Sequence, residues 1–168
     1  MFRSVELPES VPGRLLLHSM PGRFEAIEKV WFQVRSDAVG AIVCLTEEYE
    51  INLKSSQYAA ALKFGTVPCT VLPFEIREGS VPSDREAFWG LANHVASRLQ
   101  SGEAVLIHCA GGLGRTAMFA VAVLLALGEP VHEAERAVSQ AGSTVETIAQ
   151  IEMLSWCATR ASSESSRD

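Results

Sequence analysis

The chain has 168 residues, of which 48% are hydrophobic and 20% are charged, and this balance excludes wholesale disorder. Its formal net charge of −6 provides no basic surface for nucleic acid or an anionic membrane. The length fits one domain, and the four cysteines lack the C-x-x-C spacing of a zinc framework. We therefore expect a cytoplasmic, monomeric domain over residues 1–160, without a metal, followed by a polar tail over 161–168.

Short apolar runs alternate with helical patterns along the chain. Ser83 and Glu86 have the spacing of a capping box and predict the start of one of the helices. Strands alternating with helices predict an α/β fold, namely a single layered domain with a central, mostly parallel sheet of four to five strands flanked by helices. In chain order the predicted elements are a strand at 14–18, a helix at 24–37, strands at 41–45 and 70–74, a helix at 83–100, a strand at 104–108, and helices at 114–127, 131–140 and 144–159.

The most informative segment is HCAGGLGRT, residues 108–116, between the last predicted strand and an apolar helix. A glycine-rich loop at a helix N-terminus directs backbone N–H groups toward an anion. Such donors favour the thiolate form of Cys109, which would act as a nucleophile. Arg115 would hold two phosphate oxygens with its planar guanidinium. The backbone predicted to bind phosphate belongs to Ala110, Gly111, Gly112, Leu113, Gly114 and Arg115.

Two neighbours of this loop have supporting roles in the same prediction. His108 would hold the cysteine loop through hydrogen bonds, and the Thr116 hydroxyl would donate to the sulfur when it leaves. A buried cysteine beside a packing turn is the plainer interpretation, but it does not explain Arg115 at the start of an apolar helix. A nucleotide P-loop is excluded because it requires a glycine at the position of Cys109 and a lysine at that of Arg115.

Residues 108–116 resemble the signature of the cysteine-based protein tyrosine phosphatase superfamily, H-C, five residues, R and S/T. The resemblance implies a two-step mechanism through a cysteinyl-phosphate, with no metal and no organic cofactor. A chain of this length has little room for the extra recognition loop of tyrosine-specific members. We therefore expect a dual-specificity-like protein phosphatase that accepts phosphotyrosine and also phosphoserine and phosphothreonine. Its phosphate loop contains no lysine, which disfavours an inositol lipid as the substrate.

The resemblance also places the general acid in the loop that follows the third predicted strand. Kinase-associated phosphatases and phosphatases of regenerating liver carry a D-G-x-x-P pattern there. Matching Gly79 and Pro82 to this pattern puts Glu78 at the position of the acid. Glu75 and Asp84 remain alternatives, and Asp84 also suits a role at a helix N-terminus.

The same resemblance extends to the C-terminal segment STVETIAQIEML, residues 143–154. It implies that Gln150 lies near the pocket and orients the attacking water, while Glu146 replaces a glutamine of the family pattern. Cys44 corresponds to a cysteine of both relatives and would form a reversible disulfide with Cys109 under oxidation. A plain buried cysteine is the alternative for that position.

A second class of function fits the same residues. The chain carries a glutamate where its relatives have an aspartate as the acid, and its acid loop is about two residues longer. These differences suggest a catalytically weak or inactive phosphate-binding interaction module, a pseudophosphatase, as the alternative to an enzyme.

Overall fold

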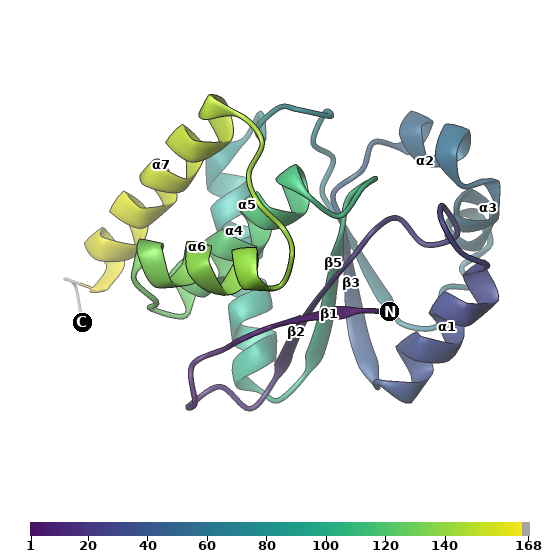
Figure 1. Ribbon diagram of the computed structural model, residues 1–168, viewed down its shortest axis with the longest axis horizontal. Helices are drawn as coiled ribbons and strands as arrows, with labels where there is room; N and C mark the ends of the chain where they lie inside the picture. Colours follow the sequence, from purple (N-terminus) through teal and green to yellow (C-terminus); the bar gives the residue numbers. More distant parts are fainter. Residues whose placement is uncertain (166–168) are drawn as a thin grey trace.

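The computed structural model describes residues 1–165 of the chain, and strands alternate with helices through most of it (Figure 1). The elements are β1 (Arg3–Val5), β2 (Arg14–His18), α1 (Ile27–Ser36), β3 (Val39–Cys44), α2 (Glu48–Lys54), α3 (Ser56–Phe64), β4 (Thr70–Pro73), α4 (Arg85–Gln100), β5 (Ala104–His108), α5 (Gly114–Ala126), α6 (Val131–Gln140) and α7 (Ile148–Ser165).

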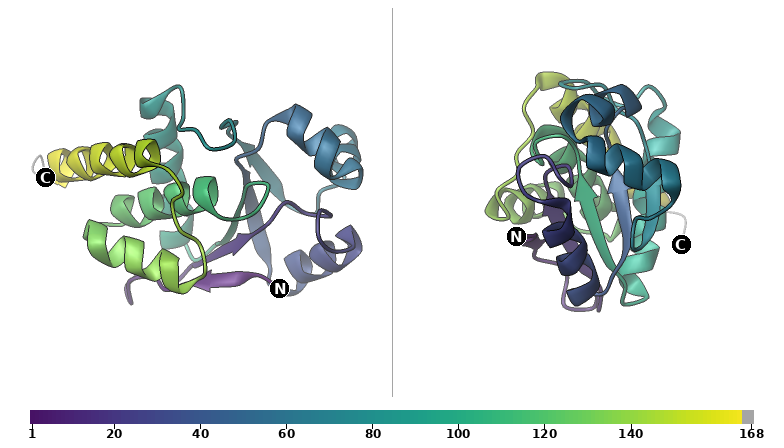
Figure 2. Two further views of the ribbon diagram at one scale, coloured as in Figure 1. Left: turned by 45° about the horizontal axis from the view of Figure 1, so that its top comes forward. Right: turned by 90° about the vertical axis from the view of Figure 1, so that its right-hand side faces the viewer.

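The strands form one five-stranded sheet in the order β1-β2-β5-β3-β4. Strands β2, β5, β3 and β4 are parallel to one another, and β1 pairs antiparallel with β2 at the edge. Helices α1, α2 and α3 cover one face, and α4 to α7 cover the other (Figures 1 and 2). The single α/β domain with a mostly parallel sheet is therefore confirmed, as a mixed sheet of five strands.

The central strands read as continuous apolar runs because both of their faces are buried. In β5, Val105 and Ile107 pack into the core beneath α4 and α5, whereas Leu106 faces the smaller core beneath α1. Strand β2 follows the same alternation, with Leu15 and Leu17 on one face and Leu16 on the other. This period of two fixes the register of the sheet, because a slip of one residue would exchange the two faces.

Helix α5 is the central element of the helical layer. Every residue from Gly114 to Leu125 is buried, and α4, α6 and α7 pack around it. This burial holds the first turn of α5 in a fixed place, and the glycine-rich loop ends at that turn. No helix among residues 1–165 is both long enough and apolar enough to cross a membrane.

Three elements were not predicted, namely β1, α2 and α3. Strand β1 has only three residues, and the two helices bury few side chains, among them Ile51 and Tyr58, so their apolar pattern is weak.

The predicted capping box is wrong by one residue, because Asp84 caps α4 by accepting a hydrogen bond from the Ala87 N–H at 2.9 Å. Helix α7 continues past residue 160 to Ser165, and positions 166–168 of the expected polar tail lie outside the described residues.

Candidate active site

The HCAGGLGRT loop connects the carboxyl end of β5 to the start of α5, at the edge of the sheet where ligands of parallel sheets bind. Cys109 is buried there, and the Gly112 N–H donates a hydrogen bond to its Sγ at 3.2 Å. Gly112 has a φ of +74°, which a side chain would strain. The loop is anchored on its outer side, because the Met20 N–H donates to the Ala110 carbonyl at 3.2 Å.

Arg115 lies buried on the first turn of α5, and Glu50 holds it from α2. Its Nη1 donates to Glu50 Oε2 at 2.8 Å and to the Ile76 carbonyl at 2.8 Å, and its Nη2 donates to Glu50 Oε1 at 3.1 Å. Burial lowers the pKa of Arg115, but Glu50 and the nearby Cys109 raise it overall. Within residues 1–165 these bonds use three of its five N–H donors. The Nε–H and one Nη2–H therefore remain, side by side, for two oxygens of a phosphate.

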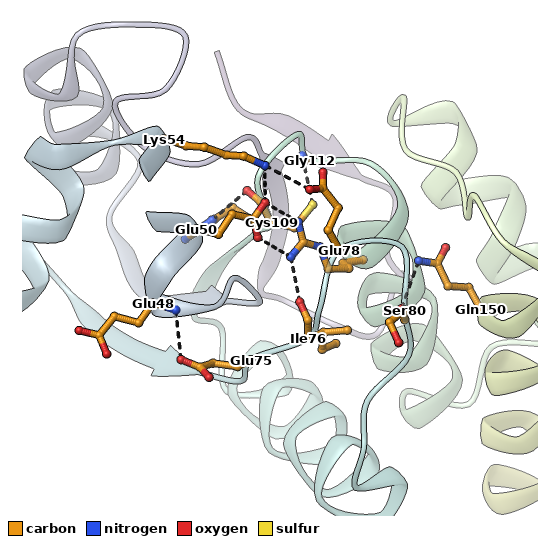
Figure 3. A network of polar contacts seen from close by, with 12 residues as sticks. Glu48, Glu50, Lys54, Glu75, Ile76, Glu78, Ser80, Cys109, Gly112 and Gln150 are labelled. Carbon is orange, nitrogen blue, oxygen red and sulfur yellow. Dashed lines mark hydrogen bonds and ion pairs between the residues drawn. The ribbon is translucent and has the colours of Figure 1, made fainter. Parts of the chain in front are cut away.

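Glu50 also links Arg115, through Lys54, to Glu78 in the loop that carries the candidate acids. Figure 3 shows Glu50, Lys54 and Glu78 along this chain of contacts. Lys54 Nζ lies 2.5 Å from Glu50 Oε1 and 3.3 Å from Glu78 Oε2. Burial raises the pKa of Glu50, but hydrogen bonds from Arg115 and Lys54 outweigh it, so the carboxylate has a pKa below its ordinary value. The four side chains alternate in charge, and the only exposed carboxylate in this chain of contacts is that of Glu78.

The structure assigns different contacts to the three candidate acids. Glu75 accepts a hydrogen bond from the Glu48 N–H at 3.2 Å and so caps α2, away from the phosphate loop (Figure 3). Asp84 caps α4. Of the three, Glu78 is linked to the Arg115 network, through Lys54. Its side chain is 69% exposed, which leaves it free to approach a substrate, and its role as the acid stays a prediction.

His108 is completely buried at the start of the HCAGGLGRT loop. Its Nδ1 lies 3.2 Å from the Cys109 carbonyl, and its Nε2 lies 2.9 Å from the Tyr58 hydroxyl. A carbonyl can only accept, so Nδ1 carries the proton and Nε2 accepts from Tyr58. Burial lowers the pKa of His108 to about 4, which keeps the ring neutral at neutral pH. The loop support expected of His108 is therefore a bond to the Cys109 backbone.

Thr116 is buried, and its hydroxyl has no hydrogen-bond partner within residues 1–165. Its expected donation to the cysteine sulfur is therefore not formed in this structure and stays a prediction for the departing thiolate.

Gln150 lies buried at the start of α7 and connects two segments near the loop. Its Oε1 accepts from the Glu146 N–H at 2.8 Å, and its Nε2 donates to the Ser80 carbonyl of the acid loop at 3.5 Å (Figure 3). Glu146 in turn places its Oε2 at 3.1 Å from the Gly114 N–H, one of the predicted phosphate donors. Glu146 thus lies beside the phosphate loop, Gln150 is linked to that loop through the Glu146 backbone, and one donor of the loop already binds a carboxylate.

Cys44 ends β3 directly opposite His108, the residue before Cys109. It is buried, and burial raises the pKa of its thiol. Both cysteines are free thiols in this structure, and the disulfide between them stays a prediction.

Sequence reasoning missed the side chains that support the site from a distance. Glu50, Lys54 and Tyr58 come from helices that carry no motif, and Arg3 and Ser143 contact the loop from either end of the chain. The single signal in the sequence is the four-residue spacing of Glu50 and Lys54, and that spacing is typical of an ordinary surface ion pair.

Comparisons with known proteins agree with this geometry. The family model Tc-R-P, described as "Polymorphic toxin system, DSP-PTPase phosphatase", matches residues 18–129. No curated protein sequence matches the chain. Among solved structures, kinase-associated phosphatase with its catalytic-site cysteine replaced by serine superposes with a TM-score of 0.79 at 20% identity, covering 92% of this chain and 91% of that one.

Two further solved structures have the same fold. Tk-PTP in its active form has a TM-score of 0.70 at 29% identity, covering 90% of this chain and 98% of its own. The human tyrosine phosphatase-like serine/threonine/tyrosine-interacting protein has a TM-score of 0.66 at 19% identity, with coverages of 90% and 94%. Because the family model spans more than half of the chain, the protein belongs to the DSP-PTPase phosphatase family of polymorphic toxin systems, within the dual-specificity-like part of the cysteine-based tyrosine phosphatase superfamily.

Proposed function

We propose that the protein is a phosphatase that hydrolyses phosphotyrosine, phosphoserine and phosphothreonine in proteins through a cysteinyl-phosphate. The observation that carries this proposal is the Gly112 N–H directed at Cys109 Sγ, within a loop whose Arg115 keeps two adjacent N–H donors. A hydrogen bond to the sulfur favours the thiolate. The loop thereby combines a nucleophile with donors for the oxygens of the phosphoryl group.

In the first step the Cys109 thiolate attacks phosphorus. The S–P bond forms as the P–O bond to the substrate oxygen breaks, and the loop amides and Arg115 hold the three non-bridging oxygens. Glu78 gives its proton to the leaving oxygen, so that an alcohol or a phenol departs rather than its anion. Glu50 keeps the guanidinium in place through this step, because it binds the Nη1–Nη2 edge of Arg115 and leaves the adjacent Nε–Nη2 edge for the phosphoryl oxygens.

In the second step water attacks the cysteinyl-phosphate. The new P–O bond forms as the S–P bond breaks, the Glu78 carboxylate takes the proton of the water, and inorganic phosphate and the thiolate are released. Gln150 orients this water in the proposal, since its bonds to the Glu146 N–H and the Ser80 carbonyl use one lone pair of its Oε1 and one of its two N–H donors.

The proposed substrate is a phosphorylated protein rather than a lipid. Residues 110–114 contain no lysine that would bind an additional phosphate. The family description and the phosphatase neighbours support a dual-specificity type of activity. The acidic balance of the chain gives no support to a nucleic-acid substrate.

Hydrolysis of p-nitrophenyl phosphate across pH tests the proposal. We expect Cys109→Ser to abolish turnover and Glu78→Gln to remove the basic limb of the pH profile, because the amide cannot donate a proton to the leaving group. Glu135→Gln, on the exposed face of α6, is the matched control and should behave as wild type. Turnover in Cys109→Ser equal to wild type would exclude this mechanism. The rates at which the wild-type protein hydrolyses phosphoserine, phosphothreonine and phosphotyrosine peptides then give its substrate preference.

The second candidate function is that of a phosphate-binding module with little or no turnover. The contact of Glu146 with the Gly114 N–H favours it, because a carboxylate occupies a donor that a phosphate would need. Rapid quenching after mixing with a phosphotyrosine peptide separates the two functions. A cysteinyl-phosphate on Cys109 supports the enzyme, whereas peptide binding without such an adduct supports the binding module.

A further inference from the structure

The Gly112 carbonyl, on the outer side of the catalytic loop, receives two short hydrogen bonds from opposite ends of the chain. Arg3 Nη2 donates to it at 2.6 Å from β1, and Ser143 Oγ donates to it at 2.6 Å from the connection between α6 and α7. Ser143 is buried. Neither residue lies within the segment 18–129 that the family model matches.

Arg3 is itself fixed between these segments. Its Nη1 donates to the carbonyls of Ala141 and Gly142, the latter at 2.5 Å, so the guanidinium joins β1, the phosphate loop and the connection before α7. Figure 2 shows β1 and α6 on the same side of the molecule. A Cβ added at Gly112 would lie 2.9 Å from Arg3 Nη2, which shows how closely the guanidinium packs on the loop.

The direction of the Gly112 carbonyl decides where the next N–H points. In a trans peptide the carbonyl and the following N–H point in opposite directions, and the described residues contain no cis bond. With the carbonyl turned outward to Arg3 and Ser143, the Leu113 N–H is turned toward the inner side of the loop. A glycine at Gly112 permits other orientations of this peptide, so the outward contacts select one of them.

Arg3 also lies within electrostatic reach of the nucleophile. Burial lowers the pKa of Arg3, and the charge of Cys109 partly offsets this effect. The Gly112 N–H that donates to Sγ belongs to the residue whose carbonyl Arg3 holds, so one guanidinium supports both sides of Gly112.

From this geometry we infer that Arg3 and Ser143 are positioning residues that lock the Gly112–Leu113 peptide of the phosphate loop in its anion-binding orientation. The inference deepens the proposed function and rests on it for the reaction, but the orientation itself controls oxyanion binding and thiolate reactivity. A change at Arg3 or Ser143 should therefore weaken phosphate binding without touching a substrate directly.

The test measures three properties in Arg3→Ala, Arg3→Lys and Ser143→Ala. These are the affinity for tungstate, an unreactive phosphate-shaped oxyanion, the pH midpoint of Cys109 alkylation by iodoacetamide, and kcat/KM for p-nitrophenyl phosphate. For Arg3→Ala we expect tungstate affinity to fall roughly 10- to 100-fold, the alkylation midpoint to move to higher pH, and kcat/KM to fall by about 10²-fold. Millimolar guanidinium should restore part of the loss.

The other variants separate positioning from general stability. Arg3→Lys keeps the charge but not the planar fork, so it should retain the alkylation midpoint better than the tungstate affinity. Ser143→Ala removes one neutral hydrogen bond and should weaken tungstate binding by about tenfold or less. The controls are Arg136→Ala, an exposed arginine paired with Glu133 on α6, and Ser155→Ala on α7, and both should match wild type.

Wild-type tungstate affinity and alkylation midpoint in both Arg3→Ala and Ser143→Ala would overturn the inference. If Arg3→Ala does not fold, Ser143→Ala decides the question by the same two measurements. A wild-type protein that binds tungstate but hydrolyses nothing would refute the proposed enzyme. The positioning role of Arg3 and Ser143 would then be judged by tungstate binding and alkylation alone.

Discussion

Glu50 binds the guanidinium of Arg115 through both of its carboxylate oxygens, at 2.8 and 3.1 Å, with both side chains almost completely buried. The pair is the most buried ion pair in the described part of the chain. It fixes the orientation in which Arg115 presents its remaining donors, so the proposed phosphate-binding role of Arg115 depends on Glu50.

Replacing Glu50 should therefore damage both stability and phosphate binding. Breaking a buried pair by removing one partner costs about 3–5 kcal/mol, because the other charge stays buried without compensation. For Glu50→Gln we expect a loss at the lower end of this range in urea unfolding, together with a higher KM for p-nitrophenyl phosphate. Glu135→Gln is the control for loss of a surface carboxylate, and equal stability of Glu50→Gln and wild type would contradict the prediction.

The buried His108 should make the free energy of unfolding depend on pH. Its pKa is lowered from an ordinary 6.5 to about 4, so the unfolded chain takes up this proton at a higher pH than the folded chain does. The contribution of His108 to the free energy of unfolding is therefore fully present above pH 6.5 and is lost as the pH falls toward 4. The loss is roughly 3 kcal/mol in total and about 2 kcal/mol between pH 8 and pH 5.

The measurement is urea unfolding at pH 8 and pH 5. His108→Gln should be less stable than wild type at pH 8, since it loses its buried hydrogen bonds, but its stability should fall less between the two values. The exposed His132, changed to Gln, is the control and should keep the wild-type slope. A slope in His108→Gln equal to that of wild type would refute the assignment.

The four cysteines should differ strongly in reactivity. Burial raises the pKa of Cys157 to about 12 and that of Cys69 to about 11, and it raises the pKa of Cys44 as well. The thiolate is the reactive form, so these three thiols should react slowly at pH 7, whereas the Sγ of Cys109 accepts a hydrogen bond from the Gly112 N–H and is the proposed nucleophile. Brief treatment with iodoacetamide followed by peptide mass spectrometry should find Cys109 modified first, and preferential labelling of Cys69 would contradict this order.

Glu146 should weaken the binding of phosphate. Its carboxylate accepts from the Gly114 N–H, so an incoming phosphate has to displace an anion. An exposed contact of this kind is worth at most about 1 kcal/mol, which corresponds to roughly fivefold in affinity. We expect Glu146→Gln to lower the inhibition constant of inorganic phosphate by up to this factor, while Glu152→Gln on α7 leaves it unchanged. An inhibition constant that rises in Glu146→Gln would show that the carboxylate assists binding instead.

The HCAGGLGRT loop and the fold class were predictable because their information is local. Residues 108–116 are contiguous, and a buried strand, a tight glycine loop and an apolar helix follow one another there. The same locality explains the accurate placement of β2, β5 and α5. Where the signal is weak, as in the three residues of β1 or the sparsely buried α2 and α3, the pattern did not predict an element.

The sequence by itself determined the HCAGGLGRT loop and the layered sheet that presents it, because backbone conformation and burial pattern are encoded by neighbouring residues. Only the tertiary structure decided which distant side chains complete the site. Glu50 reaches Arg115 across 65 positions, and Arg3 reaches Gly112 across 109. The tertiary structure also gave the three candidate carboxylates different contacts, because Glu75 and Asp84 cap helices whereas Glu78 contacts Lys54. Charge pairing acts through space, so such partners have no fixed spacing along the chain.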